Sequence, residues 1–220
     1  MQLSEFLRKI EWLESKHPYG SACIRIDSEI TIYVDPAKLS EENMKKKADL
    51  ILLSHSHDDH FSVETLENLV KPTSIIICPH DCEEILLKDH FNFNIYIVKP
   101  GETLHLNRVR IETIPAYSTS GHPISAGWIG YIIEVNDFRI YHSGDSGFIP
   151  EMKDLTNLDI ALLTVREPYM MSPEEVIQAI NAFNPKIIIP IHWIKEERAS
   201  VDYIKKNLPK STHLKILEMK

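Results

Sequence analysis

The sequence predicts a single domain of mixed α/β class over residues 1–220, and two observations carry that prediction. Short apolar runs of strand length recur along the whole chain, and helix start signals or helical periodicity separate many of them. Three of these runs are followed closely by a residue of a type that often binds metal, namely His55, Asp145 and His192. A chain of 220 residues with 43% hydrophobic side chains is long enough to bury one sizeable core.

The first half opens with a stripe of apolar residues at helical spacing. This stripe, from Leu3 through Phe6 and Ile10 to Leu13, predicts one amphipathic helix over residues 3–14. Ser62 stands where an N-cap is expected, ahead of a helix over residues 63–70. The other elements expected in this half are strands over residues 21–26, 30–34, 49–53, 74–78 and 95–99, and a helix over residues 81–88.

The second half combines hairpins, buried strands and two helices. Ser172-Pro173-Glu174-Glu175 is typical of a helix start, with a serine N-cap, proline at the first position and acids in the first turn. That helix should end near Asn184. The other elements expected are hairpins over residues 103–115 and 128–142, strands over 159–165, 186–190 and 213–218, and a helix over 198–207.

One stretch, residues 54–60, concentrates the groups that bind metals. His55, His57 and Asp59 alternate directly after an apolar run, so in extended backbone their side chains point to the same side. A turn at Asp58-Asp59 would bring His60 beside them. Imidazole and carboxylate are ligands of Zn²⁺ and neighbouring metals, so the spacing predicts a metal site. The alternatives are a polar loop or a chance cluster of histidines.

This H-x-H-x-D-H spacing resembles the signature of the metallo-β-lactamase superfamily. The likeness runs from about residue 20 to 215 and is strongest with small stand-alone metal-dependent hydrolases, a branch that includes ascorbate-phosphate lactonase-like proteins. It implies a four-layer αββα sandwich with a two-metal site at one edge of the sheets. The later segments that match are residues 115–117, 127–131, 141–145 and 189–192.

The resemblance also implies which residues bind the metals. One ion would take His55, His57 and a later histidine, the second would take Asp59, His60 and His192, and Asp145 would bridge them. Asp59 would in addition orient the attacking water. No cysteine is in this set, which leaves Zn²⁺, Mn²⁺, Fe²⁺ and Ni²⁺ as candidates, with Zn²⁺ the best single choice. The related flavo-diiron proteins usually carry Glu at the position of His57, which favours hydrolysis over redox chemistry.

The later histidine of the first ion is the least certain ligand. His122 lies in a Ser-, Gly- and Pro-rich loop, and its pairing with Pro123 matches the His-Pro pair of some relatives. His142, three residues before Asp145, is the alternative. His80 and His90 lie in elements away from the expected edge, and His105 is expected to face solvent on a hairpin strand, so we do not assign them.

A departure from the family concerns residues 164–171. Relatives tend to have a glycine pair there, whereas this chain has Arg166-Glu167. Arg166 and Lys195 are candidates for binding an anionic group of the substrate, and a solvent-facing, salt-bridged loop is the alternative.

Composition limits the partners and the compartment. The formal net charge of −8 argues against binding to nucleic acid or to acidic membranes, which depends on clustered Lys and Arg. No apolar run reaches the roughly 18 residues of a membrane span, and no signal core stands at the N-terminus. Cys23, Cys78 and Cys82 are odd in number and irregularly spaced, which favours free thiols and a cytoplasmic location.

Together these features predict a hydrolase with two divalent ions that acts on an ester, phosphodiester or lactone bond of a small anionic substrate. A non-catalytic metal-binding or regulatory module on the same fold is the main alternative, and a nuclease is the second. The sequence does not indicate an oligomeric state.

Overall fold

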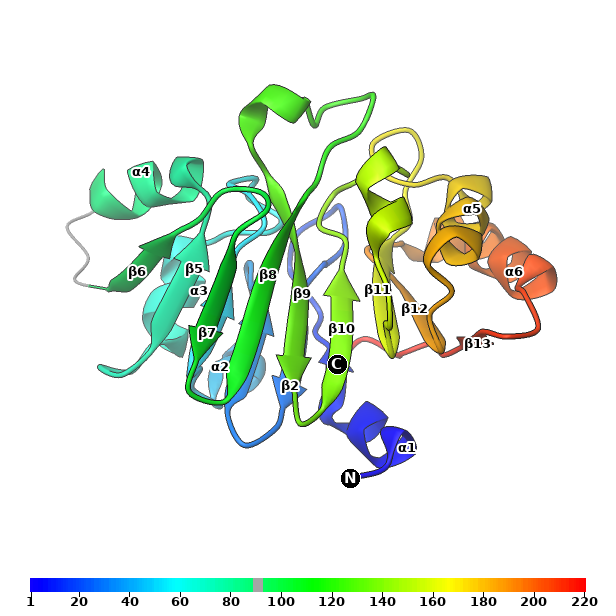
Figure 1. Cartoon of the computed structure of the whole chain (residues 1–220). Helices are drawn as coiled ribbons and strands as arrows, with labels where there is room; N and C mark the ends of the chain where they lie inside the picture. Colours follow the sequence, from blue (N-terminus) through cyan, green and yellow to red (C-terminus); the bar gives the residue numbers. More distant parts are fainter. Residues whose placement is uncertain (89–92) are drawn as a thin grey trace. The chain divides into compact units, whose positions relative to one another are not determined.

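The computed structural model describes residues 1–88 and 93–220 (Figure 1). They form two compact units, one of residues 1–99 with 218–220, and the other of residues 100–217. Each unit is built on its own β-sheet. The expectation that residues 1–220 act as a single domain stays a prediction.

The first unit contains a six-stranded sheet in the order β1-β2-β3-β4-β5-β6. Its first three strands pair antiparallel, whereas β3 to β6 run parallel. The strands are β1 (Ile10–Trp12), β2 (Ile24–Asp27), β3 (Thr31–Val34), β4 (Leu50–Leu52), β5 (Ile75–Cys78) and β6 (Asn94–Ile97). The helices are α1 (Leu3–Phe6), α2 (Glu41–Met44), α3 (Val63–Leu69) and α4 (His80–Lys88), with a 3₁₀ turn η1 (Leu7–Lys9).

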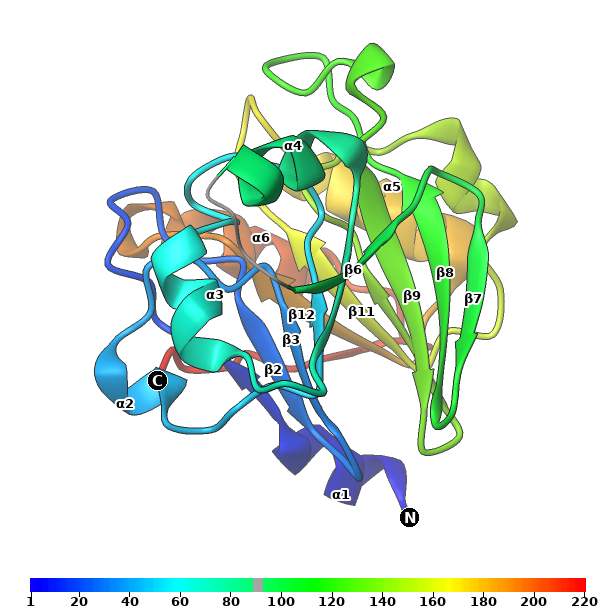
Figure 2. The same ribbon diagram turned by 90° about the vertical axis from the view of Figure 1, so that its left-hand side faces the viewer.

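Helices α3 and α4 bury their apolar faces on this sheet (Figure 2). Leu66 of α3 and Leu86 of α4 are fully buried in one cluster with Ile51 and Ile76 of the central strands. Those strands are apolar on both faces, as a parallel sheet requires. The packing fixes the central strands, and with them the loops that leave their carboxyl ends.

The predicted helix over residues 3–14 is wrong beyond its first turns. The chain is helical only through Lys9, and Ile10–Trp12 forms strand β1, which pairs with β2. Ile10 and Trp12 are buried on alternate positions of the strand, and the Trp12 indole donates a hydrogen bond of 2.7 Å to the Ser21 carbonyl. Backbone pairing and burial of the indole outweigh a marginal helix in this segment.

The second unit contains a seven-stranded sheet in the order β13-β12-β11-β10-β9-β8-β7. Strands β10 to β13 run parallel, and β7 to β10 form antiparallel hairpins. The strands are β7 (Thr103–Leu106), β8 (Val109–Pro115), β9 (Ile129–Val135), β10 (Phe138–His142), β11 (Ile160–Thr164), β12 (Ile187–Ile191) and β13 (His213–Leu214). The helices are α5 (Pro173–Phe183) and α6 (Arg198–Asn207), and the 3₁₀ turns are η2 (Ile124–Ala126), η3 (Pro150–Asp154) and η4 (Lys195–Glu197).

These elements agree with the sequence except at the C-terminal end, where the expected strand over 213–218 is only His213–Leu214. Helices α5 and α6 lie beside the β11–β12 part of the sheet, and Ile180 and Ile204 pack in its core (Figure 1). The three cysteines are free, as predicted. Within the described residues, no helix is long and apolar enough to cross a membrane.

Helix α5 begins with a complete capping box, which gives a stability prediction. The Ser172 hydroxyl accepts from the Glu175 amide at 3.2 Å, and the Glu175 carboxylate accepts from the Ser172 amide at 2.9 Å. Ser172→Ala should therefore lower the free energy of unfolding by about 1 kcal/mol, because the cap is lost. Urea denaturation measures the change. Glu174→Gln, an exposed neighbour outside the box, is the matched control and should change it by less than about 0.5 kcal/mol.

Candidate metal centre

In the first unit, the loops that leave three parallel strands meet at one edge of the sheet. Asp35 directly follows β3, Ser54 and His55 follow β4, and Asp81 follows β5. Because carboxyl ends of parallel strands share an edge, these residues come together although they are far apart in sequence. The motif at residues 54–60 is therefore anchored on the most buried part of this sheet.

The predicted turn in the motif is present. Residues 58–60 form it, and the His60 amide donates to the His57 carbonyl at 3.0 Å. His55 and His60 are buried with ring centroids 4.2 Å apart, whereas His57 is exposed and Asp59 is half-buried. The turn thus places the His60 ring beside the His55 ring, as the spacing indicated.

A buried carboxylate, Asp35, orients these histidines, although the sequence pattern does not indicate this role. One oxygen of Asp35 accepts from the Ser54 amide at 2.7 Å. The other accepts from the Ser54 hydroxyl at 2.7 Å and lies 2.9 Å from His60 Nδ1. Because a carboxylate only accepts, His60 carries its proton on Nδ1, which leaves Nε2 with a lone pair for a metal.

Ser54 fixes the tautomer of His55 in the same way. Its only hydroxyl proton goes to Asp35, so Ser54 Oγ accepts from His55 Nδ1, 2.9 Å away. His55 Nε2 is then a lone-pair nitrogen, 3.0 Å from His57 Nδ1. Asp81 also supports the loop, because it accepts from the Ser56 amide at 3.3 Å.

Asp58, between two predicted ligands, is held outside the cluster. Lys38 Nζ lies 2.6 Å from one of its oxygens and His17 Nε2 lies 3.3 Å from the other. The hydrogen bond from the Lys38 ammonium lowers the pKa of this carboxyl below its ordinary value. Asp58 is therefore an ionised, salt-bridged neighbour of Asp59.

In the second unit, two predicted ligands also follow parallel strands. Asp145 lies three residues past β10, and His192 directly follows β12, with β11 between them. The Asp145 loop is fixed by Thr164, whose hydroxyl donates to the Gly144 carbonyl at 2.7 Å. His192 is fully buried with φ +63°, a strained conformation for histidine that is typical of functional positions.

The second unit also brings His122 to Asp145. His122 Nδ1 lies 3.2 Å from the Ser120 carbonyl and 3.1 Å from the Tyr169 carbonyl, so this nitrogen carries the proton. The lone pair of Nε2 then faces Asp145 Oδ2 at 3.4 Å. His192 Nε2 lies 4.0 Å from the other oxygen, Oδ1. The Asp145 carboxylate thus has one imidazole at each of its two oxygens.

His142, the alternative to His122, has a different environment. It is fully buried in β10, and its Nδ1 accepts from the Gly144 amide at 3.2 Å. The proton of the neutral ring is therefore on Nε2, which makes that nitrogen a donor. The geometry of the second unit favours His122 as the ligand. His142 instead supports the Asp145 loop by accepting a hydrogen bond from the Gly144 amide.

Two pairs of donor atoms, one from His55 and His57 and the other from His122 and Asp145, are spaced to fit a small divalent cation. Two nitrogens bound to one tetrahedral Zn²⁺ lie about 3.3 Å apart, given Zn–N bonds of about 2.0–2.1 Å. The ring nitrogens of His55 and His57 are 3.0 Å apart, and His122 Nε2 lies 3.4 Å from Asp145 Oδ2. In the second pair a lone-pair nitrogen faces a carboxylate oxygen, which a cation between them would stabilise. These imidazoles and carboxylates are candidates for holding an ion.

The other predicted site residues lie elsewhere in the second unit. The Arg166 guanidinium donates to Glu197 at 3.1 Å and its side chain is 11% exposed. Lys195, at the start of η4, is exposed. Arg166 is therefore engaged in an ion pair, whereas the Lys195 ammonium faces solvent.

The cysteine-containing segment after β5 does not have the features of a thiolate site. Burial raises the pKa of the Cys78 thiol to about 12 and also raises that of Cys82. His80 is exposed and lies 3.1 Å from Glu83. His105 is exposed, as expected, and His90 lies outside the described residues.

Comparison with known proteins gives the family. A model of the β-lactamase superfamily domain matches residues 15–192. A UPF0173 metal-dependent hydrolase of Thermoplasma acidophilum is 30% identical over 188 residues, which cover 80% of this chain and 81% of the relative. The corresponding protein of Archaeoglobus fulgidus is 27% identical over 200 residues, which cover 84% of this chain and 83% of the relative.

Solved structures agree. A candidate metal-dependent hydrolase from Parabacteroides distasonis superimposes with a TM-score of 0.82 at 28% identity, over 96% of this chain and 93% of that one. Igni18, a metallo hydrolase from Ignicoccus hospitalis, has a TM-score of 0.75 at 19% identity, over 95% and 94% of the two chains, and shows the fold alone.

An α/β fold with two sheets and an H-x-H-x-D-H loop defines a class of metal-dependent hydrolases. This chain belongs to the β-lactamase superfamily and, within it, to the family of UPF0173 metal-dependent hydrolases. The predicted superfamily and α/β class are confirmed. The closer likeness to ascorbate-phosphate lactonase-like proteins stays a prediction.

The role of Asp35 gives a testable consequence. Asp35→Asn keeps the size of the side chain but leaves one accepting oxygen for three donors, the Ser54 amide, the Ser54 hydroxyl and His60 Nδ1. Residues that orient metal-binding histidines typically change metal affinity by about 10–100-fold, and we expect a loss in that range. Competition with a fluorescent chelator measures it. Asp27→Asn, which alters a salt-bridged carboxylate on β2, is the control, and equal affinities of both variants would contradict the role.

Proposed function

We propose that this protein hydrolyses an ester, phosphodiester or lactone bond of a small anionic substrate with the help of two divalent ions. One observation carries the proposal. Asp145 has His122 at one carboxylate oxygen, 3.4 Å away, and His192 at the other, 4.0 Å away. A carboxylate with an imidazole at each oxygen is suited to bridge two ions.

The ligand assignment follows the family pattern. His55, His57 and His122 would hold one ion, and Asp59, His60 and His192 would hold the other. The set combines imidazole and carboxylate without thiolate, which suits Zn²⁺ and also Mn²⁺, Fe²⁺ and Ni²⁺. We take Zn²⁺ as the first choice. The buried supports of His55, His60 and His122 favour a site organised before the ions bind.

Bound ions would polarise the scissile bond and lower the pKa of a water molecule toward 7. The carboxylate of Asp59 would accept a hydrogen bond from the attacking water and orient it. Asp145 would reduce the repulsion between the two cations. Lys195, which faces solvent, is the cation that we assign to an anionic group of the substrate, with Arg166 held by Glu197.

A screen of the metal-loaded protein tests the proposal. The substrates are p-nitrophenyl esters, p-nitrophenyl phosphodiesters and simple lactones, each assayed with Zn²⁺, Mn²⁺, Fe²⁺ or Ni²⁺. Turnover of one class that chelator abolishes would support a hydrolase. Metal binding without turnover of any class would favour the non-catalytic module, and salt-dependent binding of RNA or DNA would favour the nuclease.

We also retain the cytoplasm as the proposed location. The three cysteines are free and buried, which suits a reducing compartment.

A further inference from the structure

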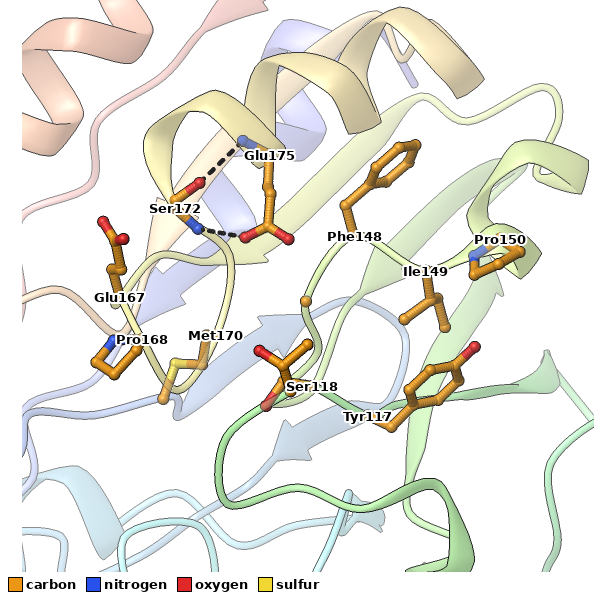
Figure 3. Close-up of a pocket in the computed structure, with 12 residues that line it drawn as sticks. Tyr117, Ser118, Phe148, Ile149, Pro150, Glu167, Pro168, Met170, Ser172 and Glu175 are labelled. Carbon is orange, nitrogen blue, oxygen red and sulfur yellow. Dashed lines mark hydrogen bonds between the residues drawn. The ribbon is translucent and has the colours of Figure 1, made fainter.

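A pocket of about 420 Å³ opens in the second unit, lined by three separate loops (Figure 3). One loop follows β8, one follows the Asp145 turn, and one precedes α5. The lining residues are Tyr117, Ser118, Thr119, Gly147, Phe148, Ile149, Pro150, Glu167, Pro168, Met170, Ser172 and Glu175.

The pocket adjoins the second unit's candidate ligands. Its lining residue Ser118 donates its amide to the His122 carbonyl at 2.9 Å, and its hydroxyl lies 3.2 Å from His122 Nδ1. Gly147, two residues past Asp145, donates its amide to the Tyr117 carbonyl at 2.9 Å. The loops that hold His122 and Asp145 therefore also form the pocket wall, so a group bound to those ligands can extend into it.

Several polar groups of the wall are already engaged in hydrogen bonds. The Tyr117 hydroxyl donates to Glu151 at 2.9 Å, and Ser172 and Glu175 bond each other in the capping box. Side chains with aliphatic or aromatic surface come from all three loops, including Ile149 and Met170. The three loops therefore offer a ligand apolar surface, alongside the polar side chains of Thr119 and Glu167.

The charge of the wall excludes an anion. None of the lining residues, all in the described part of the chain, is Lys or Arg, whereas two are glutamates, Glu167 and Glu175. A negative group entering the pocket would meet carboxylates and no cation among the lining residues, although Lys153 Nζ lies 6.0 Å from the centroid of the Phe148 ring. The anionic part of the substrate must therefore lie at the metal centre, outside this pocket.

We propose that this pocket binds an uncharged apolar group of the substrate, so that the substrate class is amphiphilic: an anionic reacting centre with an aliphatic or aromatic substituent. This inference rests on the proposed function. A volume of about 420 Å³ accommodates a phenyl or a six-carbon alkyl group. Each buried methylene should tighten binding by about fourfold.

Calorimetry with alkylphosphonates tests the inference without requiring turnover. Methyl-, butyl- and hexylphosphonate share one headgroup and differ only in apolar length, and the protein is loaded with Zn²⁺. We expect the affinity to rise from methyl to hexyl by up to about 1000-fold if all five added methylenes are buried, and by at least about tenfold if only two are. We expect 6-aminohexylphosphonate to bind more weakly than hexylphosphonate. Equal affinities along the series, tighter binding of the amino compound, or no binding of any phosphonate would overturn the inference.

Gly147 offers a direct way to fill the pocket. A Cβ there would lie 3.6 Å from Ser118 Cβ and 3.7 Å from a Glu175 carboxylate oxygen, so a larger side chain would point into the pocket. Gly147→Leu should reduce the preference for hexyl over methyl at least fivefold. Ala182→Leu adds a similar volume at another pocket of the same unit, lined by Ala182 and Asn157, and should leave the preference unchanged.

A second variant covers the case that Gly147→Leu does not fold. Phe148→Ser removes apolar surface instead of adding volume, and it should also reduce the preference for hexyl at least threefold. Wild-type preference in a folded variant of either kind would contradict the assignment.

The two proposals can fail separately. If no substrate is hydrolysed while the length dependence holds, the pocket stands and the hydrolase proposal fails. If hydrolysis is measured and the length series is flat, the pocket assignment fails alone.

Discussion

Asp59→Asn lowers turnover by at least about 100-fold while the fold stays intact; this is the largest effect that we expect from a single substitution. The exchange preserves the shape of a half-buried side chain in the turn at residues 58–60. It removes the charge that binds metal and the acceptor that orients water, and positioned acid–base groups typically contribute about 10²–10⁴-fold. The rate constant is measured on the best substrate of the screen, with metal content and circular dichroism recorded on the same sample.

The adjacent carboxylate supplies the control for this experiment. Asp58 has the same chemistry and lies one residue away, but it pairs with Lys38 and His17. Asp58→Asn should change turnover by less than about threefold, because these pairs lie near the surface. If the two variants are equally active, or if Asp59→Asn retains wild-type turnover, Asp59 does not have the proposed role.

His122→Ala removes about one metal ion per chain and most of the activity, and this is the second large effect that we expect. His122 presents its Nε2 to Asp145, and three surrounding oxygens hold its other nitrogen. Without His122, the first ion keeps only His55 and His57 as its own proposed histidine ligands. That ion should therefore be lost, while the site of the second ion stays partly filled. Elemental analysis of the purified variant gives the number of metal ions per folded chain.

His142→Gln is the matched comparison. Glutamine can still accept a hydrogen bond from the Gly144 amide through its carbonyl oxygen, so the Asp145 loop should keep its shape. We expect it to retain wild-type metal content. Full metal and activity in His122→Ala, together with loss of both in His142→Gln, would transfer the ligand assignment to His142.

The strand and helix pattern was predictable because it is local. The capping box at Ser172, the hairpin turn at Asn136-Asp137 and the motif turn at residues 58–60 all depend on neighbours within a few residues. The helix expected over residues 3–14 was wrong for the opposite reason. Its second half pairs with β2, and Trp12 also forms a bridge with Met219, near the far end of the chain.

The supports of the candidate ligands were missed for a related reason. Asp35 directly follows the strand predicted over residues 30–34, much as the motif follows β4, but the residue pattern alone gives it no role. Its contact with Ser54 and His60 depends on β3 and β4 being parallel neighbours, which the residue pattern alone does not specify. A carboxylate directly after a buried strand is nevertheless a signal that could have been used.

The apolar pocket was not predictable, because its wall comes from three loops far apart in sequence. The sequence left two possibilities for the charged segment at Arg166, binding of an anionic group or a solvent-facing, salt-bridged loop. In the structure, Glu197 binds Arg166, and the residues of this segment that line the pocket are Glu167, Pro168 and Met170. The pairing of Arg166 with Glu197, more than the composition of the segment, decides whether a cation faces a ligand at this surface.

The most direct test of the account is the metal content of the purified protein, with its thermal stability measured before and after chelation. Ligands that bind only the folded state stabilise it by about 2.7 kcal/mol at a hundredfold excess over Kd. After supplementation with Zn²⁺ we expect about two ions per chain, a melting temperature that falls in chelator, and recovery when Zn²⁺ is restored. Fewer than one ion per chain, together with a melting temperature that chelator does not change, would contradict the proposed metal centre.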